Sequence, residues 1–176
     1  MRIVAGRFGG RRLSAPAGDA TRPTSDRVRE SLFSVLGPLE GACVLDLFAG
    51  SGALGIEALS RGATSAVFVD RSAQAVAAIR ANLGTLGIEA EVRRMEARAA
   101  LRTASARGEA YDLLFLDPPY RHAAGLGREL SEAVRAVLAP GARLISESDR
   151  RAPLELTLPL SDERRYGDTL IRIHDT

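Results

Sequence analysis

Residues 42–55, ACVLDLFAGSGALG, join an apolar run to a glycine-rich turn and decide the fold. The run, residues 42–47, is almost wholly apolar, which is typical of a buried strand in a parallel sheet. Gly50, Gly52 and Gly55 then follow the spacing G-x-G-x-x-G, and the chain from residue 53 onward predicts a helix. The first two glycines permit a tight turn and leave no Cβ between the backbone and a ligand, and the third lets the helix pack close to the sheet. The segment therefore predicts a strand, a ligand-binding turn and a helix.

Beyond this turn the chain alternates between short apolar strands and helices. We expect strands at residues 65–70, 90–94, 111–116 and 142–148, and helices at residues 53–61, 72–83, 97–105 and 127–138. This alternation is typical of an α/β fold, in which helices cover both faces of a mostly parallel sheet.

The last quarter of the chain has a different pattern. Residues 154–160, LELTLPL, alternate with period two, and residues 163–174 follow without room for a helix. We therefore expect an antiparallel hairpin at the end of the sheet. Five parallel strands followed by a hairpin favour a Rossmann-like methyltransferase over a dinucleotide dehydrogenase, which would normally continue with another helix and parallel strand.

The segment before residue 42 predicts a short arm followed by a helix. Residues 2–5 and 11–14 are strand-like and suggest a small hairpin or an extended arm. The helix should begin with Thr24 or Ser25 as its N-cap and end at Gly37. We therefore divide the chain into a basic N-terminal arm and linker, residues 1–23, and one main domain, residues 24–176.

Composition limits the class of protein. A chain of 176 residues with 45% hydrophobic residues is long enough for one domain with a core. No apolar run is long enough to cross a membrane and the first residues lack the apolar centre of a secretory signal, so we expect a soluble, cytoplasmic protein. The single cysteine, Cys43, and the separated His122 and His174 predict neither a disulfide nor a metal site.

Basic residues are concentrated at the start of the chain. The net charge is only +2, but residues 1–30 carry seven arginines against three acids. All 24 basic residues are arginine, which suits bidentate contacts to phosphate, although a GC-rich coding sequence would give the same composition. This local surplus indicates a polyanionic partner. The candidate phosphate contacts are Arg7, Arg11, Arg12, Arg22, Arg27 and Arg29, with Phe8 as a candidate stacking residue.

Two acids indicate what the glycine-rich turn binds. Asp70 ends the next strand, twenty residues after Gly50, where it can accept hydrogen bonds from two ribose hydroxyls. This contact would serve NAD and S-adenosylmethionine equally well. Asp46, just ahead of the turn, would repel a pyrophosphate but could hold the ammonium group of a methionyl moiety. The pair favours S-adenosylmethionine and leaves a nicotinamide dehydrogenase as an alternative.

The tetrad Asp117, Pro118, Pro119 and Tyr120 follows the strand expected at residues 111–116. An exocyclic amine of a nucleobase is a poor nucleophile because its lone pair is delocalised into the ring. The Asp117 carboxylate and the Pro118 carbonyl supply two acceptors for its N–H groups, and consecutive prolines preorganise them. Tyr120 supplies a ring on which an extruded base can stack. The tetrad predicts methylation of a base amine, without separating adenine N6 from guanine N2.

Four segments together resemble one family. They are RPTSDRVRESLFSVL at 22–36, VLDLFAGSGALGIEALSRGA at 44–63, FLDPPY at 115–120 and YGDTLIRI at 166–173. The sequence resembles the bacterial RsmD family of ribosomal RNA guanine-N2 methyltransferases over nearly its whole length. The glycine-rich turn and the tetrad are shared with many amino-directed methyltransferases, including enzymes that act on adenine in DNA. RPTSDRVRE and the absence of a target-recognition domain are what select this family.

The resemblance implies a class I, Rossmann-like S-adenosylmethionine-dependent methyltransferase fold with a mostly parallel seven-stranded sheet. It implies catalysis by the tetrad and a monomeric enzyme that acts on 16S RNA of an assembling 30S particle. Glu96 departs from the family's pattern, in which Asp or Asn precedes Ala at the end of the third strand. The alternatives are a DNA adenine-N6 methyltransferase and a noncatalytic RNA-binding assembly factor. The expected cofactor contacts are Thr24, Asp46, Phe48, Gly50, Ser51, Gly52, Asp70, Arg71, Glu96 and Ala97.

Overall fold

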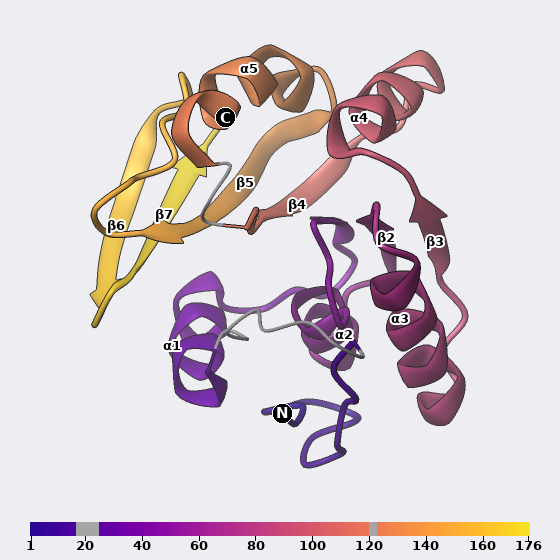
Figure 1. The fold of residues 1–176 in the computed structure, drawn as a ribbon. Helices are drawn as coiled ribbons and strands as arrows, with labels where there is room; N and C mark the ends of the chain where they lie inside the picture. The colour runs from indigo at the N-terminus through magenta and orange to yellow at the C-terminus, as the bar shows by residue number, and fades with distance from the viewer. Residues whose placement is uncertain (17–24, 120–122) are drawn as a thin grey trace.

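The structure, a computed structural model, describes residues 1–16, 25–119 and 123–176. Within these ranges its centre is a seven-stranded sheet in the order β3-β2-β1-β4-β5-β7-β6 (Figure 1). Neighbouring strands from β3 to β5 are parallel, and β7 pairs antiparallel with both β5 and β6. The predicted mostly parallel sheet with a terminal hairpin is confirmed. The strands are β1 (Cys43–Leu47), β2 (Ser65–Asp70), β3 (Glu91–Arg94), β4 (Tyr111–Leu116), β5 (Leu138–Asp149), β6 (Leu160–Tyr166) and β7 (Thr169–Asp175).

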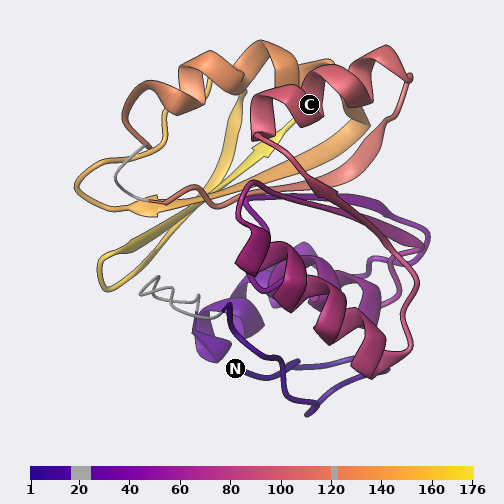
Figure 2. The same ribbon diagram turned by 45° about the vertical axis from the view of Figure 1, so that its right-hand side comes forward.

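Helices cover both faces of the sheet, as the alternation predicted. Figures 1 and 2 show α1, α2 and α3 on one face and α4 and α5 on the other. A separate apolar core fills each of the two layers. Across the described ranges, no helix combines the length and the apolar character needed to span a membrane. The helices are α1 (Asp26–Leu36), α2 (Ala53–Ser60), α3 (Ala73–Leu86), α4 (Ala97–Ala106) and α5 (Ala123–Arg135).

Helix α1 begins and ends where the sequence predicts. Ser25 is the N-cap, and its hydroxyl accepts a hydrogen bond from the Val28 N–H at 3.3 Å. Gly37, with φ +69°, ends the helix by donating its N–H to the Phe33 carbonyl. The other N-cap candidate, Thr24, lies outside the described residues.

The described part of the N-terminal arm, residues 1–16, packs along α2 and reaches α3 (Figure 1). The predicted hairpin is reduced to one antiparallel bridge between Arg2 and Arg12. Gly6 lies so close to α2 that a Cβ there would overlap the Ser60 backbone oxygen. Three apolar side chains of the arm are buried in the core shared with α1, α2 and α3: Ile3, Phe8 and Leu13.

Two expectations near the C-terminus were wrong. Residues 154–160 do not form a strand, because β6 begins only at the last of them. The Thr157 N–H donates instead to the Ser131 hydroxyl of α5 at 3.1 Å. Leu154 and Leu158 are buried and Leu156 is partly buried in the core beside this helix, so the period-two pattern correctly marks the apolar side of the segment although the segment forms no strand. Helix α5 also lies earlier than the predicted 127–138, since the end of that range already belongs to β5.

Candidate active site

The glycine-rich turn after β1 is bonded directly to the last residue of β2. The Gly50 N–H donates to Asp70 Oδ2 at 2.9 Å, and the Ser72 N–H donates to Asp70 Oδ1 at 2.8 Å. A carboxylate oxygen has two lone pairs, so each oxygen can accept a second hydrogen bond. Asp70 can therefore order the turn and also receive ribose hydroxyls.

A small depression opens beside Asp70. Four of the side chains that line it are apolar, which suits the faces of a purine ring, and Asp70 places a carboxylate at its wall. Phe48 has φ +62°, the one positive φ of a non-glycine residue in the described ranges, and such strain concentrates at binding sites. Five of the predicted cofactor contacts meet here. The lining residues are Phe48, Val69, Asp70, Arg71, Met95, Glu96 and Ala97.

Glu96 and Arg71 lie at the rim of this depression. Glu96 occupies the N-cap position of α4 without making a side-chain cap bond, and its Oε1 lies 3.6 Å from Arg71 Nη1. Both side chains are more than half exposed. Glu96 thus gives this rim a long, solvated carboxylate that pairs with an arginine.

A Cβ added to each of the three glycines of the turn would meet different surroundings. A Cβ on Gly50 would enter open space, with the Phe48 carbonyl at 3.9 Å as its nearest neighbour. A Cβ on Gly55 would overlap the Phe68 ring, which confirms that α2 packs close to the sheet. For Gly52 the expected reason for a glycine was wrong, because a Cβ there would face three apolar core side chains, and its contact with the cofactor stays a prediction. Its φ of +78° still serves the turn. An open backbone, an apolar depression and a nearby carboxylate together fit an adenosine-containing cofactor.

The end of β4 lies beside this turn. Leu116, the last residue of β4, pairs in register with Leu47, the last residue of β1. Asp117 therefore follows β4 where Phe48 follows β1, and the sheet brings Asp117, the first residue of the tetrad, next to the glycine-rich turn. Pro118 is buried and Pro119 is exposed. The fourth tetrad residue, Tyr120, lies outside the described residues.

Three acids lie at the ends of adjacent strands. Asp46 on β1 is almost fully buried, and its Oδ2 accepts a hydrogen bond from the Gly55 N–H at 2.9 Å. Asp117 follows β4, and Glu147 is buried on the paired strand β5. Because β4 and β5 pair in parallel, with Leu116 opposite Ser146, Asp117 and Glu147 are neighbours across the two strands. Sequence reasoning missed Glu147, whose only signal is an acid between two serines in the strand expected at residues 142–148.

Burial and the charges of neighbouring acids raise the pKa of Asp46 and of Asp117. Burial raises the pKa of Asp46 to about 7, helped by the charge of Asp70 and opposed by the Gly55 hydrogen bond. Burial also raises the pKa of Asp117 well above its ordinary value, and the charges of Glu147 and Asp46 raise it further. A carboxyl with a raised pKa at the end of a strand is well placed for proton transfer near neutral pH.

The predicted phosphate contacts separate into exposed and buried arginines. Arg7, Arg11 and Arg12 are exposed on the arm, and Arg27 is exposed on α1. The Arg7 and Arg11 guanidinium carbons lie 5.2 and 5.9 Å from the centre of the Phe8 ring. Phe8 itself is only 8% exposed, so the arginines cover the ring that we expected to stack on a base. Arg22 lies outside the described residues.

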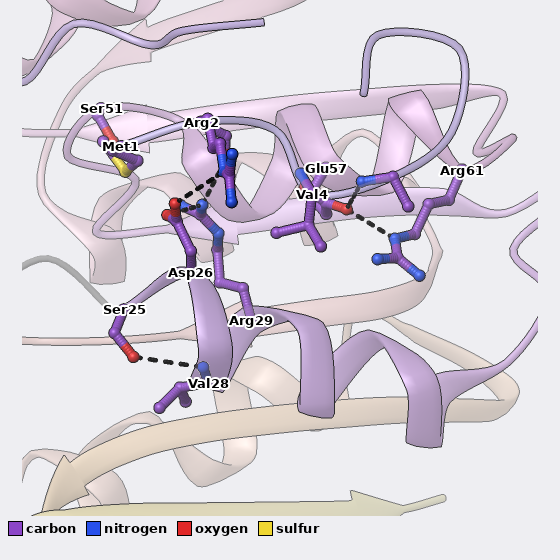
Figure 3. A network of polar contacts seen from close by, with 11 residues as sticks. Met1, Arg2, Val4, Ser25, Asp26, Val28, Arg29, Ser51, Glu57 and Arg61 are labelled. Atoms are coloured by element: carbon purple, nitrogen blue, oxygen red, sulfur yellow. Dashed lines mark hydrogen bonds and ion pairs between the residues drawn. The ribbon is translucent and has the colours of Figure 1, made fainter. Parts of the chain in front are cut away.

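For Arg29 the prediction of a phosphate contact was wrong. Its side chain is buried, and Nη2 donates to the Arg2 carbonyl and, at 2.7 Å, to Asp26 Oδ1 (Figure 3). Desolvation lowers its pKa, opposed by the charges of Asp26 and Glu57. The available signal was its helical position, since Arg29 lies four residues before the buried Phe33 and belongs to the same stripe.

Polar residues of α2 and α3 that hold the arm were also missed. Glu57 accepts hydrogen bonds from the Val4 N–H at 2.7 Å and the Ala5 N–H at 3.0 Å, and it pairs with Arg61 (Figure 3). Asn82 bonds to the end of the arm. Both side chains are buried, at 0% and 4% exposure, and a buried polar residue needs such partners.

Comparisons with known proteins agree with this arrangement. Residues 1–175 match the family described as Conserved hypothetical protein 95. A Bacillus subtilis protein, "Putative rRNA methyltransferase YlbH", is 40% identical over 99% of this chain and 98% of its own length. Escherichia coli ribosomal RNA small subunit methyltransferase D is 41% identical over 69% of this chain and 61% of its own length.

A solved structure extends the likeness to three dimensions. A hypothetical protein from Thermus thermophilus has a TM-score of 0.85 and 31% identity, and the match covers 100% of this chain and 99% of that one. The strand order 3-2-1-4-5-7-6 with its antiparallel hairpin is that of class I S-adenosylmethionine-dependent methyltransferases. Sequence family, strand order and site geometry agree: the chain belongs to the RsmD family of S-adenosylmethionine-dependent ribosomal RNA methyltransferases.

Proposed function

We propose that this protein transfers a methyl group from S-adenosylmethionine to the exocyclic N2 of a guanine in 16S ribosomal RNA. The observation that carries the proposal is the register of β1 and β4. Leu47 pairs with Leu116, so the glycine-rich turn and Asp117 begin side by side at one edge of the sheet. A cofactor on the turn and a base against Asp117 would then be adjacent.

The residues at this edge have distinct tasks in the proposed reaction. Bound S-adenosylmethionine supplies a methyl group that is already activated on a sulfonium. Asp70 and the depression beside it hold the adenosine, and Asp117 accepts an N–H of the target amine and orients its lone pair. The raised pKa of Asp117 also lets this carboxylate take the proton that the amine loses on methylation.

The second carboxylate beside Asp117 supports guanine over adenine. The Watson–Crick edge of guanine presents N1–H and the N2 amine, which are both donors, whereas adenine presents N1 as an acceptor next to its amine. Asp117 and Glu147 on paired strands can accept two adjacent donors. This preference requires the ionised form of Asp117, because an adenine would place its N1 lone pair against that negative charge, which is unfavourable in a desolvated site, whereas a protonated Asp117 could donate to the lone pair.

The exposed arginines support RNA as the partner. Arg7, Arg11 and Arg12 on the arm and Arg27 on α1 have exposed side chains that can meet phosphates. If four arginines contact phosphates of a single-stranded target, log affinity should fall with log salt at a slope of about −3. The chain resembles relatives named for small-subunit RNA, and we propose the RNA of an assembling 30S particle as the substrate of a monomeric enzyme.

Labelled methyl transfer tests this function. Small-subunit RNA and particles from cells that lack the gene are incubated with the protein and labelled S-adenosylmethionine, in parallel with duplex DNA of random sequence. We expect label in the RNA or the particle and background in DNA. Label in adenine of DNA would replace the proposal by a DNA methyltransferase. No transfer to any substrate, with retained RNA affinity, would favour a noncatalytic assembly factor.

A further inference from the structure

Asn82 of α3 is bonded to two distant segments at once. Its Oδ1 accepts the Ser14 N–H at 2.9 Å, and its Nδ2 donates to the Ser14 carbonyl at 3.0 Å. The same Nδ2 donates to the Ser51 carbonyl of the glycine-rich turn at 2.9 Å. Asn82 is 4% exposed, so these three bonds replace water almost completely. One side chain thus joins the end of the arm to the turn.

The other end of the arm meets the turn as well. The Ser51 hydroxyl donates to Met1 Sδ at 3.7 Å (Figure 3), and the Leu13 N–H donates to the Met1 carbonyl at 3.1 Å. Both ends of the arm therefore converge on Ser51. Between them, Glu57 and Ser60 hold the arm on α2, the helix that starts at the turn.

The Ser51 carbonyl matters because it fixes the conformation of the turn. It belongs to the peptide that leads into Gly52, whose φ is +78°, and it directly follows Gly50, whose N–H is bonded to Asp70. Loss of the Asn82 bond would leave this carbonyl without its partner and release the peptide, and an unmade buried hydrogen bond is costly. The orientation of the Gly50 N–H would then be less well defined.

We propose that Asn82 is a positioning residue that makes arm docking and cofactor binding stabilise each other. The coupling is reciprocal. A bound cofactor orders the turn and raises the equilibrium constant for docking of the arm, and a docked arm raises cofactor affinity by the same factor. The inference rests on the proposed function in taking S-adenosylmethionine as the ligand of the turn. Because Arg7, Arg11 and Arg12 lie on this arm, the cofactor-loaded protein would present the arginines in one fixed arrangement.

Two measurements without RNA test the coupling. Calorimetry gives the Kd for S-adenosylhomocysteine, and limited trypsin digestion reports release of the arm by cleavage after Arg11 and Arg12. For the wild type we expect S-adenosylhomocysteine to slow this cleavage. For Asn82→Ala we expect Kd to rise about fivefold, the effect of one net hydrogen bond, and the ligand to lose its protective effect.

A second variant and a control separate coupling from loss of the fold. Gly6→Ala forces the arm off Ser60 without touching Asn82, so it should also raise Kd. Thr85→Ala removes an exposed hydroxyl of α3 that bonds only to the Ala81 carbonyl in the described structure, and it should leave both readouts unchanged.

The outcomes are distinct. An unchanged Kd with retained ligand protection in folded Asn82→Ala overturns the proposal. If Asn82→Ala does not fold, Gly6→Ala decides: faster cleavage of the arm with an unchanged Kd overturns the coupling, and a raised Kd supports it. Neither readout depends on the methylated base. A failure of guanine-N2 transfer would therefore leave this result standing, and the converse also holds.

Discussion

The backbone N–H of Gly50 lies 2.9 Å from Asp70 Oδ2, although 20 residues separate the two in the chain. This bond links the turn after β1 to the end of β2, so the acid of the predicted cofactor motif shapes the turn. The Ser72 N–H bonds to the other oxygen. The same carboxylate thus has a structural task beside the binding task that we propose for it, and a single substitution should disturb both.

Asp70→Asn should weaken S-adenosylhomocysteine binding by roughly tenfold or more, as calorimetry would measure. The amide keeps one acceptor oxygen but turns an NH₂ group toward either Gly50 or Ser72, and it loses the charge that favours ribose hydroxyls. The matched control is Asp112→Asn, whose carboxylate accepts the Cys43 N–H at 2.8 Å at the other end of the sheet. Equal affinities for Asp70→Asn and the wild type would remove Asp70 from the cofactor site.

Asp117→Ala should lose methyl transfer by roughly 10³-fold or more while its affinity for S-adenosylhomocysteine changes little. The reason is that Asp117 lies beside the turn but outside the depression that fits the adenosine. Single-turnover transfer to the RNA substrate and calorimetry measure the two quantities, with Asp112→Asn again as control. Near-normal turnover would remove Asp117 from the mechanism.

Asp46 should make the protein less stable as the pH rises. Its pKa is about 7 in the folded protein and 3.8 ordinarily, so the folded chain keeps this proton over the window between them. The unfolding free energy that Asp46 contributes is therefore fully present below about pH 4 and is lost as the pH rises to about 7. Asp46→Asn can still accept the Gly55 N–H and has no carboxyl to ionise. Its free energy of unfolding, relative to that of the wild type, should therefore rise across this window by an amount on the order of 2–4 kcal/mol. Urea unfolding at several pH values measures the difference. Parallel stability curves would show that Asp46 ionises normally.

Arg29→Ala should destabilise the fold rather than weaken RNA binding specifically. It removes a buried guanidinium that bonds to Asp26 and to the Arg2 carbonyl, so we expect a loss of roughly 2–4 kcal/mol. Arg27→Ala on the exposed side of the same helix should change stability by less than about 0.5 kcal/mol. Urea unfolding of both variants tests this contrast. An Arg29→Ala protein as stable as the wild type would mean that the buried guanidinium contributes nothing.

Local patterns were enough for the parts of the fold and site that depend on neighbouring residues in the chain. The apolar strands, the Ser25 cap and the turn from Gly50 to Gly55 all follow from spacing and residue type. The placement of Asp117 beside the turn followed from the rule that parallel strands bring their carboxyl ends to one edge.

The features that were missed depend on contacts between distant segments. The sequence alone predicts Arg29 to be a surface cation, whereas in the structure it bonds to the Arg2 carbonyl and to Asp26. Asn82 bonds to both the arm and the turn, and no local sequence pattern predicts that these two segments lie together beside α3. Residues 154–160 alternate like a strand, yet the hydroxyl of Ser131 takes the N–H that a ladder would have used.

The central claim concerns the atom that receives the methyl group. The most direct measurement is mass spectrometry of nucleosides from small-subunit RNA, taken from cells that lack the gene and treated with the protein and S-adenosylmethionine. We predict one new peak of N2-methylguanosine at a single nucleotide, absent with Asp117→Ala. A new N6-methyladenosine peak, or methylation at a ring nitrogen or a ribose oxygen, would contradict the account.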